Sequence, residues 1–126
     1  MNQLKFTASH EWLRQETDGS ITIGITDFAQ SELGGIVFVQ LPAVGDTLAQ
    51  GAEAAVIESV KVAGEINMPL AGTVLTVNAA LEADPSIVND SPQDAGWFFT
   101  FKPDNPAALD ALLDDAAYQQ LISNHS

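Results

Sequence analysis

Short stretches of alternating apolar and polar residues recur along most of the chain, and turn-forming residues separate them. A period of two residues is typical of a β-strand with one buried face. The pattern predicts strands at residues 11–15, 20–25, 35–40, 54–59, 63–68, 72–77 and 97–102. Several short strands at this spacing favour a mainly β protein, built as a flattened β-barrel or a two-sheet sandwich.

A short segment at residues 27–33 predicts helix rather than strand. Thr26 or Asp27 can cap its first turn, and Gly34 can end it. The segment 81–94 shows neither the two-residue period of a strand nor the 3.6-residue period of a helix. We therefore expect a long loop there with at most one helical turn.

A second helical segment is predicted near the C-terminus, at about residues 105–123. Asn105 can cap it, and Pro106 suits the first helical position. Asp114 or Asp115 can then cap a further stretch that runs through Ile122. We therefore expect a core at about 20–102 with a helical segment packed beside it.

The 126 residues suffice for one domain, and we expect residues 1–126 to form a single unit without a linker. The net charge of −13 argues strongly against nucleic acid as a partner, because affinity for phosphate comes from Lys and Arg. It also argues against docking on anionic membranes and favours partners with a basic face. We expect a protein of the bacterial cytoplasm, because residues 1–12 resemble neither a signal peptide nor a transit peptide; a processed organellar chain is the alternative. We also expect a monomer.

The absence of cysteine excludes disulfides, Fe–S clusters and thiol catalysis by the protein itself. His10 and His125 are too few for a metal site made of several histidines, and a Ser-His-Asp triad is not expected. We expect His10 to form structural hydrogen bonds, and Trp12 and Trp97 to lie in or near the core. No metal site and no catalytic residue is predicted.

Lys61 lies between two predicted strands, in the run Glu58-Ser59-Val60-Lys61-Val62. A lysine at the tip of a hairpin is exposed and mobile, so it either keeps a turn soluble or carries a covalent group. Gly72 follows eleven residues after Lys61. Together with the flanking apolar positions, this pattern resembles a lipoyl-attachment signature.

The resemblance extends over nearly the whole chain and is to the glycine cleavage system H protein family. Its further motifs are Ser-His-Glu-Trp at 9–12, Gly-Ile-Thr-Asp at 24–27, Val-Phe-Val-Gln-Leu-Pro at 37–42 and Gly-Trp at 96–97. Some positions depart from the usual pattern. Gly35 replaces an acidic residue, Phe28 replaces His or Tyr, and Glu32 stands where some members carry His.

The resemblance implies that Lys61 carries lipoic acid as an amide, with Glu58, Ser59 and Val60 as the attachment motif. It implies a non-catalytic carrier of the glycine cleavage system. Its partners would be a pyridoxal-phosphate glycine decarboxylase, a tetrahydrofolate-dependent aminomethyltransferase, a flavin-containing dihydrolipoyl dehydrogenase and a lipoylating enzyme. It further implies that the loaded arm is sheltered in a cleft near Ser9, Glu11, Glu32 and Glu65.

Other readings of the hairpin lysine remain. A biotin carrier usually has Met on both sides of its lysine, whereas Val60 and Val62 stand here. A lipoyl domain of a 2-oxoacid dehydrogenase usually has Asp before the lysine and a linker to a catalytic domain. A lipoyl donor in a relay to other lipoate-dependent enzymes would need the same residues as the glycine cleavage carrier and is the alternative function. An interaction protein with this fold would not need Lys61.

Overall fold

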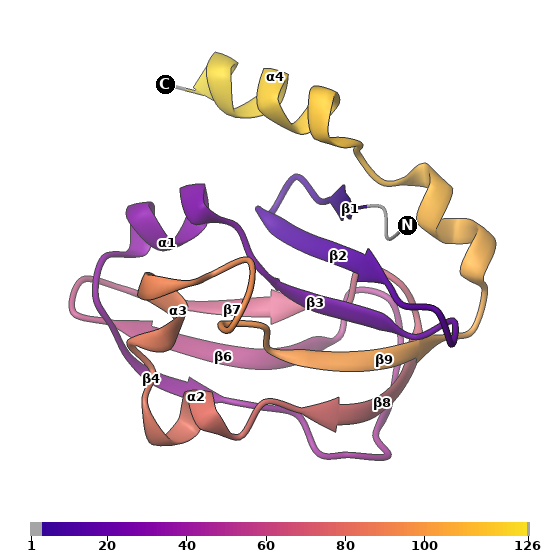
Figure 1. Ribbon diagram of the computed structural model, residues 1–126, viewed down its shortest axis with the longest axis horizontal. Helices are drawn as coiled ribbons and strands as arrows, with labels where there is room; N and C mark the ends of the chain where they lie inside the picture. Colours follow the sequence, from indigo (N-terminus) through magenta and orange to yellow (C-terminus); the bar gives the residue numbers. More distant parts are fainter. Residues whose placement is uncertain (1–3, 126) are drawn as a thin grey trace.

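The fold consists of two antiparallel β-sheets that face each other, as the computed structural model of residues 4–125 shows (Figure 1). The larger sheet has the strand order β1-β2-β3-β9-β8-β5, and the smaller sheet has the order β4-β6-β7. The strands of the larger sheet are β1 (Leu4–Phe6), β2 (Glu11–Gln15), β3 (Ile21–Ile25), β9 (Phe99–Pro103), β8 (Gly72–Val77) and β5 (Thr47–Leu48). Those of the smaller sheet are β4 (Ile36–Gln40), β6 (Glu53–Ser59) and β7 (Ala63–Asn67).

The hydrophobic core fills the space between the two sheets. Phe99 and Phe101 of β9 and Ile23 of β3 are completely buried on one side, and Ile57 and Ile66 are buried on the other. The prediction of a mainly β protein is therefore confirmed. The two sheets do not close into a barrel, so the sandwich describes the fold better than the barrel.

Each predicted strand has a counterpart, with small shifts at its ends. The strands β1 and β5 were not predicted, because three and two residues are too few to show a period. Tertiary contacts define both strands: Leu4–Phe6 pairs with β2, and Thr47–Leu48 pairs with β8. The last strand begins at Phe99, two residues later than expected.

The first helix, α1 (Asp27–Leu33), has the predicted bounds. Thr26 is its N-cap, because its side-chain oxygen accepts a hydrogen bond from the backbone N–H of Ala29 at 3.2 Å. Gly34 ends the helix at φ 81° and ψ −156°, a region that only glycine adopts without strain. Local sequence therefore predicts both ends of this helix.

The segment 81–94 contains two short helices where a loop with at most one helical turn was expected. They are α2 (Ala80–Ala83) and α3 (Ile87–Asp90). Leu81 and Val88, one from each helix, are completely buried in the core. Burial of these two side chains stabilises turns that are too short to form alone.

The C-terminal segment is less regular than expected. Residues Pro106–Ala111 form a 3₁₀ helix, and the side chain of Asn105 does not cap it. The helix α4 (Asp115–His125) follows, and Asp114 caps it by accepting a hydrogen bond from the N–H of Ala117 at 2.8 Å. A bridge between Phe6 and Leu113 joins this segment to β1. Among residues 4–125, no helix is long and apolar enough to cross a membrane.

Candidate functional site: a hairpin lysine beside an acidic cleft

Lys61 lies at the tip of the hairpin that joins β6 to β7, and its side chain is exposed. The hydroxyl of Ser59 organises the turn. It accepts hydrogen bonds from the N–H groups of Lys61 and Val62, at 3.2 and 3.0 Å, and donates one to the carbonyl of Val62 at 3.0 Å. The N–H of Ser59 also donates to that carbonyl at 2.8 Å. Ser59 therefore fixes the backbone under the lysine and leaves the lysine side chain free to reach outward.

The hairpin tip is held beside the end of α1. The N–H of Val60 donates a hydrogen bond to the carbonyl of Gly35 at 3.0 Å. The Lys61 side chain passes over Gly34, where a Cβ atom added to the glycine would lie 3.1 Å from Lys61 Cε. An added Cβ at Gly35 would meet nothing within 4 Å. The unusual glycine at position 35 therefore leaves open space and does not change the placement of the lysine.

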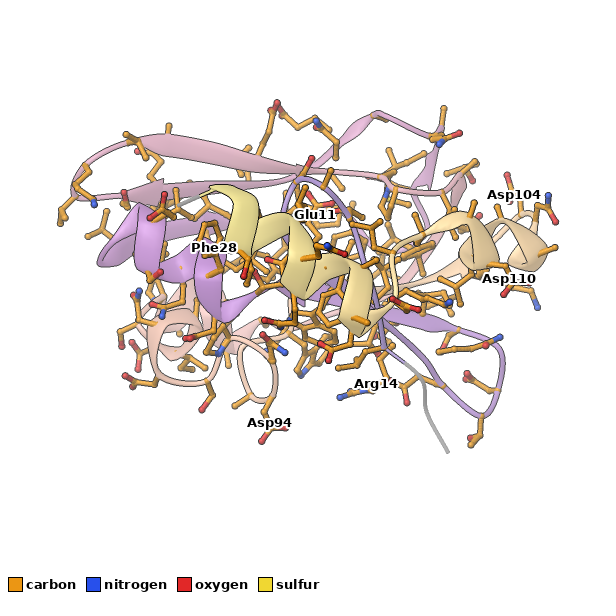
Figure 2. All side chains as sticks on the ribbon, turned by 90° about the horizontal axis from the view of Figure 1, so that it is seen from above. Glu11, Arg14, Phe28, Asp94, Asp104 and Asp110 are labelled. Carbon is orange, nitrogen blue, oxygen red and sulfur yellow. The ribbon has the colours of Figure 1, made fainter. Side chains whose placement is uncertain are left out.

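A cleft of about 270 Å³ opens next to this tip, between α1, the start of β2 and the β6–β7 hairpin. It brings together all four residues expected to form a cleft, although they come from distant parts of the chain. Its walls are formed by Ser9, His10, Glu11, Ile25, Phe28, Ala29, Glu32, Leu33, Ile57, Gly64 and Glu65. Figure 2 labels Glu11 of β2 and Phe28 of α1, two of these lining residues. The lining is apolar along the walls and acidic at several points.

Glu11 is the buried acid of the cleft, with 4% of its surface exposed. Burial raises the pKa of its carboxyl group from 4.5 to about 7, although hydrogen bonds from the Thr7 side chain and the Asn67 backbone oppose the shift. The Thr7 hydroxyl donates to the carboxylate at 3.1 Å. Near neutral pH, Glu11 can therefore be either neutral or negatively charged, and a cation in the cleft would favour the charged form.

The other acids of the cleft are exposed. Glu32 lies on α1, and Glu65 lies on β7, one of the two edge strands of the smaller sheet. Glu65 also hydrogen-bonds to the exposed Glu53 and thereby raises the pKa of Glu53. Ser9 is exposed at the rim. A cleft with one buried and two exposed carboxyl groups suits a cargo that carries a positive charge.

His10 lines the cleft, which the sequence did not indicate. Its backbone has φ 69°, and its Nδ1 atom lies 2.9 Å from the hydroxyl of Tyr118. Its ring packs against Phe28 with 4.7 Å between centroids. The hydrogen bond agrees with the structural role that was expected for His10. The apolar lining was also missed, because single apolar positions in a β-rich sequence look like ordinary core residues.

In the part of the chain that the structure describes, no group of three or more His, Asp or Glu residues could hold a metal ion.

A two-sheet sandwich that presents an exposed lysine on a braced hairpin, beside an acidic cleft, is the architecture expected of a carrier domain. Comparison with known proteins identifies the family. The model of the family "Glycine cleavage H-protein" matches residues 4–125. The chain therefore belongs to the glycine cleavage H-protein family. It is a lipoyl carrier protein of that system rather than a catalyst, as the sequence indicated.

The similarity to individual relatives spans almost the full length. The chain is 56% identical over 122 residues to glycine cleavage system H protein 1 of Pseudomonas syringae pv. tomato, covering 97% of this chain and 95% of the relative. It is 51% identical over 122 residues to the H protein of Methylocella silvestris, covering 97% of each. The crystal structure of a glycine cleavage system H protein from Mycobacterium marinum superposes with a TM-score of 0.87 at 32% identity. That match covers 96% of this chain and 97% of the other.

Proposed function

We propose that Lys61 is the residue that carries lipoic acid, joined through an amide to its Nζ atom. The observation that carries this proposal is the position of Lys61 on a braced, exposed turn, where its side chain passes over Gly34 at the end of α1, next to the cleft residue Leu33. Glu58, Ser59 and Val60 complete the attachment motif. Ser59 shapes the turn, while Glu58 and Val60 are exposed beside the lysine and accessible to a modifying enzyme.

The cleft fits the proposed group. Ile25, Leu33 and Ile57 offer apolar surface to an aliphatic chain, and the volume of about 270 Å³ is open to solvent on one side. When bound, lipoic acid supplies a disulfide that can be reduced and can carry a one-carbon amine, chemistry that a protein without cysteine lacks. The protein contributes a fixed attachment point and a sheltered place for the arm.

Ser9, Glu11, Glu32 and Glu65 would shelter the loaded arm. A cationic aminomethyl group is attracted by the carboxylates and is kept from bulk water by the walls of the cleft. The buried Glu11 contributes most in this proposal, because charges interact more strongly where water is excluded. Glu32 and Glu65 act at the exposed rim, where solvent weakens their effect.

The proposed partners are the other components of the system. The carrier takes an aminomethyl group from a pyridoxal-phosphate glycine decarboxylase and delivers it to a tetrahydrofolate-dependent aminomethyltransferase. A flavin-containing dihydrolipoyl dehydrogenase restores the disulfide, and a lipoylating enzyme installs the cofactor. The net charge of −13 supports docking on basic faces of these enzymes and opposes nucleic-acid or membrane partners. We propose a monomeric, single-unit carrier in the bacterial cytoplasm; the relatives named above come from bacteria.

The test is intact mass measurement with peptide mapping after incubation with a lipoate ligase, lipoate and ATP. One lipoyl adduct is expected, on the peptide that contains Lys61. Lys61→Arg should take up no lipoyl group, and its melting temperature should change little because an exposed turn residue contributes little to stability. Wild-type protein that remains unmodified, or an adduct on another lysine, would refute the assignment.

A further inference from the structure

The outer face of the smaller sheet carries an exposed aromatic residue near the lysine. Phe38 of β4 pairs with Glu58 of β6, which in turn pairs with Ala63 of β7. The Phe38 side chain is 45% exposed. The neighbours Ile36 and Val39 on the same strand are buried in the core. Phe38 therefore faces solvent from a strand that is otherwise anchored to the interior.

An irregularity in β4 produces this exposure. Ile36 pairs with Ser59 and Phe38 pairs with Glu58, so two steps on β4 match one step on β6. Such a bulge inserts an extra residue and redirects the side chains around it. Val37, the extra residue, is 57% exposed next to Phe38. Without the bulge, strict alternation would place one of these two residues in the core.

Further apolar side chains are exposed at the same end of the sheet. Val60 and Val62, on either side of Lys61, are 73% and 51% exposed. The hydrogen bond from the Val60 N–H to the carbonyl of Gly35 holds this tip beside the start of β4. Four exposed apolar side chains within one end of a small sheet are more than scattered surface residues, and such groups mark interaction sites.

The charge of this face restricts the partner. The strands β4, β6 and β7 and the turn between β6 and β7 contain the acids Glu53, Glu58 and Glu65, and Lys61 is their single basic residue. A partner would therefore combine an apolar pocket for an aromatic side chain with Lys or Arg at its rim.

We propose that Phe38, with Val37 beside it, is a docking surface for the enzyme that attaches the lipoyl group to Lys61. This inference rests on the proposed modification of Lys61. The modifying enzyme has to bring its reacting atoms to Nζ itself, so its surface has to contact the protein around the hairpin. The later partners act on the dithiolane ring, which is separated from Nζ by the whole acyl chain.

The attachment step is balanced with ATP and lipoate as the co-reactants. The lipoyl carboxylate becomes a mixed anhydride with AMP, releasing pyrophosphate. The Nζ electron pair then forms a bond to the carboxyl carbon, the carbon–oxygen bond to AMP breaks, and the lysine ammonium loses two protons in total. Nothing is oxidised or reduced. Phe38 takes no part in this chemistry and acts only through docking.

The experiment compares Phe38→Thr with Leu75→Thr as acceptors for a lipoate ligase. Threonine keeps a high strand propensity, so the exposed position should remain folded. Leu75 is 38% exposed on β8 of the other sheet and serves as the matched control. We expect kcat/KM for lipoylation to fall about tenfold for F38T, in line with loss of an interface anchor. L75T should stay within about twofold of wild type.

A second measurement separates attachment from later use of the arm. Each variant is lipoylated fully by long incubation and then assayed as a substrate of dihydrolipoyl dehydrogenase and of glycine decarboxylase. Rates equal to wild type are expected for F38T. Unchanged lipoylation of F38T, or a loss confined to the later enzymes, would overturn the docking assignment. Wild-type protein that is not modified at Lys61 would instead refute the proposed function, so the two failures are distinguishable.

Discussion

The hydroxyl of Tyr118 in α4 lies 2.9 Å from Nδ1 of His10 at the cleft, although the two residues are 108 positions apart. The same hydroxyl lies 2.6 Å from Oγ1 of Thr26, the N-cap of α1. The Tyr118 ring stacks on Phe6 at 4.7 Å. The C-terminal helix therefore supports two walls of the cleft, the loop at His10 and the start of α1. Figure 1 shows α4 beyond β1, the strand at one edge of the larger sheet.

Tyr118→Phe should destabilise the protein by about 1–2 kcal/mol, because it removes the hydroxyl that hydrogen-bonds to the buried Thr26 and the half-buried His10. The ring stacking on Phe6 would be kept. Urea unfolding measures the change in free energy. Thr100→Val is the control, since it removes a hydroxyl from the exposed Thr76–Thr100 pair, whose oxygens also lie 2.6 Å apart. We expect less than about 0.5 kcal/mol for this control. Equal effects of the two substitutions would show that the Tyr118 hydroxyl has no special role.

The pKa of Glu11 predicts a specific dependence of stability on pH. The pKa is about 7 in the folded protein and is assigned the ordinary value of 4.5 in the unfolded chain. The folded state therefore binds more protons between these values. The stabilisation that Glu11 adds to the free energy of unfolding is fully present below pH 4.5 and is lost as the pH rises through 7. At about 1.4 kcal/mol per pH unit, the loss is on the order of 3 kcal/mol.

Glu11→Gln should remove this dependence while keeping an oxygen that accepts the hydrogen bond from Thr7. Urea unfolding of both proteins at pH 5 and pH 8 makes the comparison. Other titrating groups affect both proteins alike, so the difference between them isolates Glu11. We expect the free energy of unfolding of the variant, relative to that of the wild type, to rise by about 2–3 kcal/mol between pH 5 and pH 8. A difference that stays constant with pH would mean that Glu11 titrates normally.

The two adjacent glycines at the end of α1 should respond differently to alanine. Gly34→Ala places a Cβ 3.1 Å from Lys61 Cε and forces alanine into a backbone region open only to glycine. We expect a loss of about 1–3 kcal/mol, measured as a lower free energy of unfolding. Gly35→Ala meets no atom within 4 Å and should be nearly neutral. Equal free energies of unfolding for Gly34→Ala and Gly35→Ala would contradict the positive-φ backbone conformation of Gly34 beside Lys61.

Much of the fold could be read from the sequence, because local patterns cause it. Alternation predicted the long strands, and Thr26 with Gly34 defined α1 at both ends. The hairpin with Lys61 at its tip also followed from local pattern. Prediction failed where tertiary contacts decide the outcome. The turns at α2 and α3 form because Leu81 and Val88 are buried, and β5 exists because it pairs with β8.

The sequence by itself determined the hairpin, the short helix and the placement of Lys61 between two strands, since each depends on residues a few positions apart. The resemblance to a family also named the four cleft residues, but it gave no distances or burial. Only the tertiary structure decided that Glu11 is buried, that His10 lines the cleft and that Tyr118 supports it. These properties arise when distant segments pack together, and no local periodicity records which segments will meet.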